Sequence, residues 1–258
     1  MKKLTALLIA ATLTLSVFPA AVAGDVSTFH DVAGHWGEVH LTKMIEARII
    51  VGDGRGYAMP DKPVTRSEAE VMVYKLVGLE YNYKESPDLP REGAISLIYG
   101  FFGDEEPPLS FRSSFTDFDE VSDSRKYSVL VLEYMGLISG WNGKIFPHDT
   151  VTRAEFAALL SKAAGVFINE DTDFEGAELE RATIRTPGIT VKNLTAEYLF
   201  VDAMDGVTLE GCDIGTVVCR DGVIHLVNTS VTEMLAPRAD VIADEHSVIE
   251  RLLPPIEP

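Results

Sequence analysis

Cysteine and positive charge are both scarce in this chain of 258 residues. Cys212 and Cys219 are the only cysteines, too few for a disulfide framework, and no Cys-x-x-Cys spacing indicates zinc. The sequence allows a disulfide between them but favours two buried, unpaired thiols. The chain has 22 Lys and Arg against 40 Asp and Glu, a formal net charge of −18. So acidic a surface repels nucleic acid and anionic lipid, and neither is expected as a partner.

Long apolar runs are absent after the N-terminus. Met1 to Lys3 form a short charged start, residues 4–17 form an apolar run, and Ala21-Val22-Ala23 follows with small residues. This order is typical of a secretory signal peptide, and the run is too short to span a bilayer comfortably. We expect cleavage after Ala23 and a secreted protein without a membrane span; an uncleaved anchor is the alternative.

Catalytic and cofactor signatures are also lacking. The turn at residues 52–56 superficially resembles a phosphate or calcium loop, but it lacks the Lys-Ser/Thr of the first and the closing Glu of the second. A flexible turn between helices is the better interpretation. The sequence therefore predicts no enzyme, no cofactor and no metal site.

One motif is present twice. Residues 63–68 read Pro-Val-Thr-Arg-Ser-Glu, and residues 150–155 read Thr-Val-Thr-Arg-Ala-Glu. Each copy ends a longer repeat, because residues 29–32 align with 115–118 and residues 49–52 with 137–140. Such internal self-similarity indicates a repeat architecture.

The shared Thr-Arg-x-Glu segment predicts the start of a helix. A Thr followed three residues later by Glu, ahead of an apolar-periodic stretch, is a capping box in which each side chain bonds the other residue's amide. The Arg between them then lies in the first helical turn, where free amides and the helix dipole already favour an anion. An Arg there either binds an anionic ligand or is simply solvated. The residues are Thr65, Arg66 and Glu68 in the first copy and Thr152, Arg153 and Glu155 in the second.

The order Phe-x-Asp, helix, Gly-rich turn, an aligned Pro (Pro60 and Pro147) and Thr-Arg-x-Glu resembles the S-layer homology (SLH) family of cell-surface anchoring modules. The resemblance implies three repeats in a pseudo-threefold arrangement, with the motif Arg lining grooves that bind secondary cell-wall polysaccharide carrying pyruvyl ketals. It makes Arg66 and Arg153 ligand candidates. The Thr and Glu residues of the motif, Thr65, Glu68, Thr152 and Glu155, would support the helix starts.

A third repeat is present at most in part, because residues 80–114 are too few for a complete copy. Aligning Arg91 with Arg66 places residues 89–102 as the second helix of a truncated middle repeat, which makes Arg91 a further ligand candidate; an unrelated linker helix is the alternative. Trp36 matches the family's first-helix Trp, and Trp141 lies in a turn where it could stack on a sugar ring or pack on Phe146.

The last third of the chain is strand-rich, with a shorter repeat. Its copies begin at Val191, Leu209, Leu226 and Ala243, which are 18, 17 and 17 residues apart. This spacing favours the stacked coils of a β-solenoid over an antiparallel sandwich. Solenoids can also be enzymes, and the candidate carboxylates here are Asp202, Asp205, Glu210 and Asp213.

The predicted fold class is α+β, with two full and one truncated helical SLH repeat followed by a small parallel β-solenoid. The predicted function is non-catalytic anchoring of a surface protein to wall polysaccharide, with other S-layer proteins as further partners; a wall-anchored carbohydrate-active enzyme is the alternative. The predicted segments are a signal peptide at 1–23, repeats at 24–79, 80–114 and 115–170, and the solenoid at 171–258.

Overall fold

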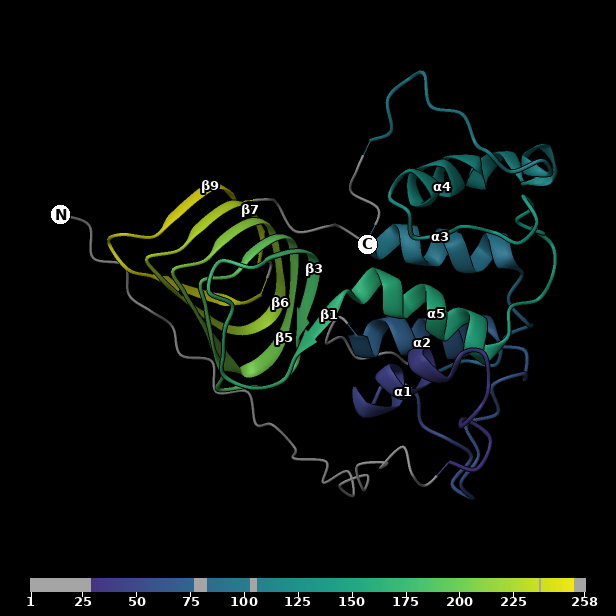
Figure 1. Ribbon diagram of the computed structural model, residues 1–258, viewed down its shortest axis with the longest axis horizontal. Helices are drawn as coiled ribbons and strands as arrows, with labels where there is room; N and C mark the ends of the chain where they lie inside the picture. Colours follow the sequence, from purple (N-terminus) through teal and green to yellow (C-terminus); the bar gives the residue numbers. More distant parts are fainter. Residues whose placement is uncertain (1–28, 77–82, 103–105, 237, 253–258) are drawn as a thin grey trace.

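The computed structural model describes residues 29–76, 83–102, 106–236 and 238–252. A helical part comes first and a stack of parallel strands follows (Figure 1). The predicted signal peptide lies outside the described residues. Within them, no helix is long and apolar enough to cross a membrane.

The helical part contains five α-helices and a short 3-10 helix among the described residues. They are α1 (Glu38–Glu46), α2 (Arg66–Leu76), α3 (Arg91–Phe102), η2 (Phe118–Glu120), α4 (Asp123–Tyr134) and α5 (Arg153–Ala164).

Both predicted capping boxes are confirmed, and they start α2 and α5. The Thr152 hydroxyl accepts from the Glu155 amide at 3.2 Å, and the Glu155 carboxylate accepts from the Thr152 amide at 2.8 Å. Thr65 and Glu68 make the same pair of bonds at 3.2 and 2.9 Å. Two amides that an α-helix leaves without partners are therefore satisfied at each start.

The segments ahead of α2, α3 and α5 form a closed ring of backbone hydrogen bonds. Val64 N–H donates to Val151, Val151 N–H donates to Leu89, and Leu89 N–H donates to Val64, at 2.8, 3.0 and 2.9 Å. The three side chains are buried. Because each segment donates to the next in the same way, the ring has approximate threefold symmetry, and α3 starts at the position aligned with α2 and α5.

The first helix of each full repeat packs on a ring helix from another segment. α1 packs on α5, where a side chain added at Gly37 would come within 3.1 Å of Ala154 Cβ. α4 packs on α3, where Ser122 donates through its amide and its hydroxyl to the Glu92 carboxylate at 2.9 and 2.8 Å. α2 contacts the other two ring helices, α3 and α5.

The Phe-x-Asp motif holds the loop that leads to each ring segment. The Asp31 carboxylate accepts from the amides of Ala58 and Met59, both at 2.8 Å. Asp117 accepts in the same way from residues 145–146, at 2.9 and 2.8 Å. The shared Asp thus fixes equivalent loop conformations in the two full repeats.

The β part is a solenoid in which every strand pair is parallel. The strands are β1 (Val166–Ile168), β2 (Thr172–Asp173), β3 (Glu178–Ile184), β4 (Thr190–Lys192), β5 (Thr195–Glu210), β6 (Asp213–Val227), β7 (Ser230–Leu235), β8 (Asp240–Ala243) and β9 (Val248–Leu252). This excludes the antiparallel sandwich, and β1 begins before the predicted boundary at residue 171.

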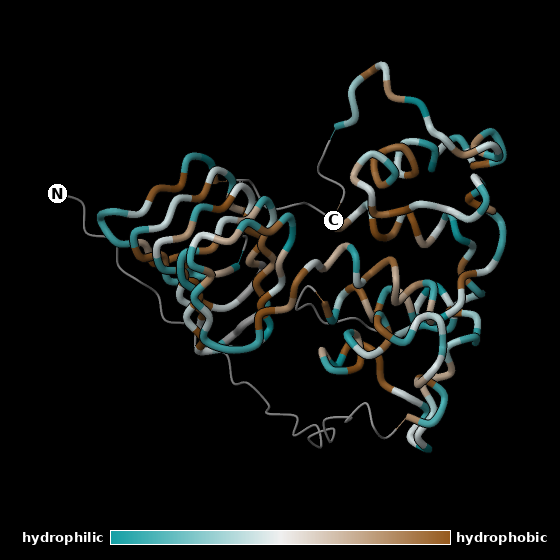
Figure 2. The backbone as a smooth tube through the Cα atoms, viewed as in Figure 1, coloured by the Kyte–Doolittle hydropathy of each residue, from teal (hydrophilic) through white to brown (hydrophobic). Residues whose placement is uncertain are grey.

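The coil repeat predicted from the sequence sets the strand register. Leu199, Val217 and Met234 are successive register partners, 18 and 17 residues apart, and all three are fully buried. Apolar and polar residues alternate along the coils (Figure 2), and the buried apolar residues form one core cluster inside the solenoid. Cys212 and Cys219 are buried in this core and form no disulfide, as favoured from the sequence, and burial raises the pKa of the Cys212 thiol.

The helical and β parts are packed together. Phe102 at the end of α3 contacts Phe200 of β5 edge to face, with ring centroids 4.9 Å apart. The Arg185 guanidinium donates to the carbonyl of Ala47 at the end of α1, and the Lys43 ammonium donates to that of Gly165. Cations thus bind carbonyls that helix ends leave free.

Candidate functional site

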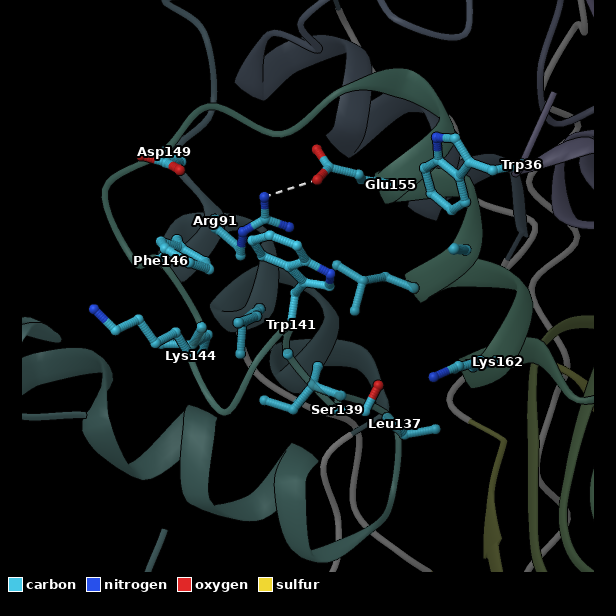
Figure 3. Close-up of a pocket in the computed structure, with 16 residues that line it drawn as sticks. Trp36, Arg91, Leu137, Ser139, Trp141, Lys144, Phe146, Asp149, Glu155 and Lys162 are labelled. Atoms are coloured by element: carbon cyan, nitrogen blue, oxygen red, sulfur yellow. Dashed lines mark hydrogen bonds and ion pairs between the residues drawn. The ribbon is translucent and has the colours of Figure 1, made fainter. Parts of the chain in front are cut away.

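A groove of about 580 Å³ opens beside the ring of helix starts (Figure 3). It is lined by α3, by the loop between α4 and α5, and by one side of α5 from Glu155 to Lys162. Trp36 completes one side, because the packing of α1 on α5 places the residue before Gly37 next to Glu155. The groove is therefore built from all three segments of the chain that surround the ring.

The groove contains an ion pair between two helix starts. Arg91 Nη2 lies 2.8 Å from Glu155 Oε1, and the two side chains are 23% and 27% exposed. The second oxygen of Glu155 caps α5 by accepting from Thr152. Glu155 therefore holds Arg91 in place through a carboxylate that the capping box has already fixed.

The charge in the groove is opposite to that of the whole chain. Its charged residues are the cations Arg91, Lys144 and Lys162 and the acids Asp149 and Glu155. The local formal charge is thus positive although the chain carries −18. A site of this sign in an acidic protein favours an anionic ligand.

Two exposed indoles flank these charges. Trp36 is 64% exposed and Trp141 is 70% exposed, and both line the groove. The ring centroids of Trp141 and Phe146 lie 6.3 Å apart, and the backbone of Phe146 has φ 52°. Positive φ is strained for an aromatic residue, and the two bonds to Asp117 hold it there. Flat apolar faces beside cations suit a sugar ring that carries a negative charge.

Arg153 occupies the equivalent ring position but is not part of this groove. It is only 6% exposed, and its Nη2 donates to the carbonyl of Val51 at 3.0 Å. Burial lowers the pKa of its guanidinium, while Glu68 and Asp31 nearby favour the charged form. This Arg therefore ties α5 to the loop of the first repeat.

Arg66 occupies the third position and points to solvent. Its side chain is 62% exposed and its Nε lies 2.9 Å from Glu70 Oε1 on the same helix. Arg91 faces Glu155, the capping Glu of the neighbouring helix start. In the ring alignment the residue that would face Arg66 in the same way is Gly93. With no carboxylate from the neighbouring helix start, Arg66 pairs along α2 instead.

The structure thus divides the sequence-predicted residues into two sets. Arg91, Glu155, Trp36 and Trp141 come together in the groove. Arg66, Arg153, Thr65, Glu68 and Thr152 do not line it. Sequence reasoning missed Lys144, Phe146 and Lys162 as groove residues. The available signal for the loop that holds the first two was the alignment of Pro147 with Pro60 of the first repeat.

Two of the four carboxylates considered for an enzyme are paired with cations. Asp202 pairs with Arg185 at 3.3 Å, and Glu210 pairs with Lys192 at 2.7 Å. No group of three or more His, Cys, Asp or Glu suited to a metal ion occurs among the described residues.

The S-layer homology domain family model matches residues 28–70 and 114–157, so the chain carries two SLH repeats. These matches cover both capping boxes and leave α3 between them.

Similar proteins include three surface-layer proteins of Bacillus. The chain is 24% identical over 240 residues to an "S-layer protein" of Bacillus licheniformis, covering 77% of this chain and 27% of that protein. It is 22% identical over 244 residues to "S-layer protein sap" and 27% identical over 243 residues to "S-layer protein EA1", both of Bacillus anthracis. These matches cover 81% and 78% of this chain and 28% of each relative. The chain thus spans little more than a quarter of these relatives, and the matches indicate a cell-surface protein.

Proposed function

We propose that this protein is a non-catalytic surface protein that binds secondary cell-wall polysaccharide through the groove around Arg91. The observation that carries the proposal is a positively charged, indole-flanked groove in a strongly acidic protein. The two SLH repeats and the S-layer relatives support a wall-anchoring role.

The ligand feature best suited to the groove is a carboxylate, such as that of a pyruvyl ketal, on a sugar ring. Arg91 presents five N–H donors in a planar fork, and Glu155 takes one of them. A ligand carboxylate would accept from other N–H groups of the two Nη atoms, with Lys144 and Lys162 adding charge. Trp36 and Trp141 would stack on the sugar faces.

We assign residues 80–114 to a truncated middle repeat that supplies the third ring helix. The support is the hydrogen-bond ring, in which Leu89 takes the same place as Val64 and Val151. The truncated repeat would then contribute the ligand-binding Arg91. The solenoid would project from the wall and contact other S-layer proteins.

The test is retention of the purified protein on cell-wall sacculi before and after chemical removal of the secondary polysaccharide. We expect retention on intact sacculi, little on stripped sacculi, and at least a tenfold loss for Arg91→Gln, estimated from one charge-assisted pair. Arg55→Gln removes the same charge from an exposed turn and serves as the matched control. Equal retention on stripped sacculi would overturn the proposal.

A further inference from the structure

The last described coil of the solenoid leaves core positions uncovered. Val217 and Met234 are stacked register partners and both are fully buried. Leu252 is the next register partner, in β9, yet it is 66% exposed. The same coil exposes Ile242 and Val248, each at 52%. Apolar side chains that an additional coil would cover are therefore open to solvent.

The backbone of this coil is also open. Among the described residues, β9 pairs only with β7, and β8 pairs only with β6. The opposite end of the solenoid adjoins the helical part, where β1 follows α5 directly (Figure 1). An unpaired sheet edge recruits a further strand. When two copies pair through the same edge, the contact is self-complementary and closes as a two-fold dimer.

We propose that the free edge of β9 pairs with β9 of a second copy of this chain, antiparallel across a two-fold axis. The sequence of β9 is self-complementary in this arrangement. With the axis between Glu250 and Arg251, each Glu250 lies opposite Arg251 of the second copy. Opposite charges directly across an antiparallel pair are stabilising.

The same register matches the apolar residues. Ile249 packs against the solenoid core and Leu252 is the register partner of buried Met234, so both belong to the inward face. The axis between Glu250 and Arg251 places Ile249 opposite Leu252 of the second copy. A shift of one residue would place Glu250 opposite itself, which is repulsive.

A charge swap tests this pairing. The full chain is measured by sedimentation over a range of concentrations, and we expect a dimer. Glu250→Arg places Arg opposite Arg and Arg251→Glu places Glu opposite Glu, so each variant alone should dimerise about tenfold more weakly or worse. An equal mixture of the two variants should form a heterodimer, since all facing charges are then opposite.

Two controls distinguish the alternatives. Glu170→Arg makes the same charge change at an exposed position away from the edge and should leave the dimer intact. Arg251 also pairs with Glu233 within its own chain, so thermal unfolding of Arg251→Glu is compared with that of the parent. A monomer at all concentrations, a dimer insensitive to both charge variants, or dimerisation only after deletion of residues 253–258 would overturn the proposal.

Discussion

Arg91 and Arg153 occupy equivalent positions in the ring of helix starts, yet their surroundings differ. Arg91 lies in an open groove against Glu155. Arg153 is 6% exposed and bonds the backbone of Val51. An equivalent position in the ring therefore does not by itself make an Arg available to a ligand. Whether the side chain is open or buried depends on the loop that it faces.

The third position extends the comparison. Arg66 keeps the capping box, but Gly93 stands where a facing Glu would be, and the Arg pairs with Glu70 on its own helix. Arg91 lacks a capping box of its own, with Pro90 and Gly93 replacing Thr and Glu, but it faces Glu155. The partner of Arg91 is thus the Glu of the capping box at the neighbouring helix start, and a capping box at its own helix start is not required.

The largest expected effect is the difference in stability between Arg153→Gln and Arg91→Gln. Arg153→Gln should lower the free energy of unfolding by about 1–3 kcal/mol, because a buried charged hydrogen bond is lost. Arg91→Gln should lower it by roughly 0–1 kcal/mol, because the pair is partly exposed. Urea unfolding of both variants measures this, and equal losses would contradict the structural role of Arg153.

Glu92, next to Arg91, should make the protein acid-sensitive. Burial raises the pKa of Glu92, but hydrogen bonds from Ser122 and Arg125 outweigh this effect and hold the pKa below its usual value. A carboxyl with a lowered pKa adds stability above its unfolded pKa, and this stability is lost as pH falls below about 4.5. In urea unfolding between pH 7 and 3, the free energy of unfolding of Glu92→Gln should fall less steeply with decreasing pH than that of the parent protein. The same acid slope in both proteins would refute this assignment.

The two capping boxes should be equivalent although their Arg residues are not. Thr152→Ala and Thr65→Ala should each cost about 1 kcal/mol of stability, because each removes one helix cap. Thermal unfolding of the two variants provides the measurement, with Thr152→Ser and Thr65→Ser as conservative controls that should retain most of the stability. A loss of stability in only one of the two Thr→Ala variants would contradict the equivalence of the two capping boxes.

The smallest effect is expected for Trp141→Ala. The ring is 70% exposed, so stability should change little. Retention on sacculi should fall about two- to tenfold, the equivalent of roughly 0.5–1.5 kcal/mol for one aromatic contact. Trp141→Phe should restore part of the retention. Unchanged retention in Trp141→Ala would remove this residue from the site.

Local patterns predicted the repeated elements well. The capping boxes start α2 and α5 as expected, and the coil spacing gave parallel strands in register. These features depend on residues close in sequence or on a regular period. The alignment of Arg91 with Arg66 also predicted a helix over residues 89–102, and α3 runs from Arg91 to Phe102 although the cap residues are absent.

The groove itself could not be derived from the motif. Arg91 meets Glu155 across 64 residues, and Trp36 reaches it only because α1 packs on α5. The burial of Arg153 depends on a carbonyl 102 residues away. These contacts join residues that are far apart in the sequence. They depend on how the ring and the loops pack together, which no local sequence pattern predicts.

The most direct test of the central claim uses the two tryptophans as reporters, because the chain contains no others and both line the groove. Solubilised wall polysaccharide is titrated into labelled protein while the two indole N–H signals are followed by nuclear magnetic resonance. We predict that both signals shift together and saturate, and that Arg91→Gln weakens the response at least tenfold while Arg153→Gln leaves it nearly unchanged. Binding of the polysaccharide with both indole signals unmoved would contradict the assignment of the groove.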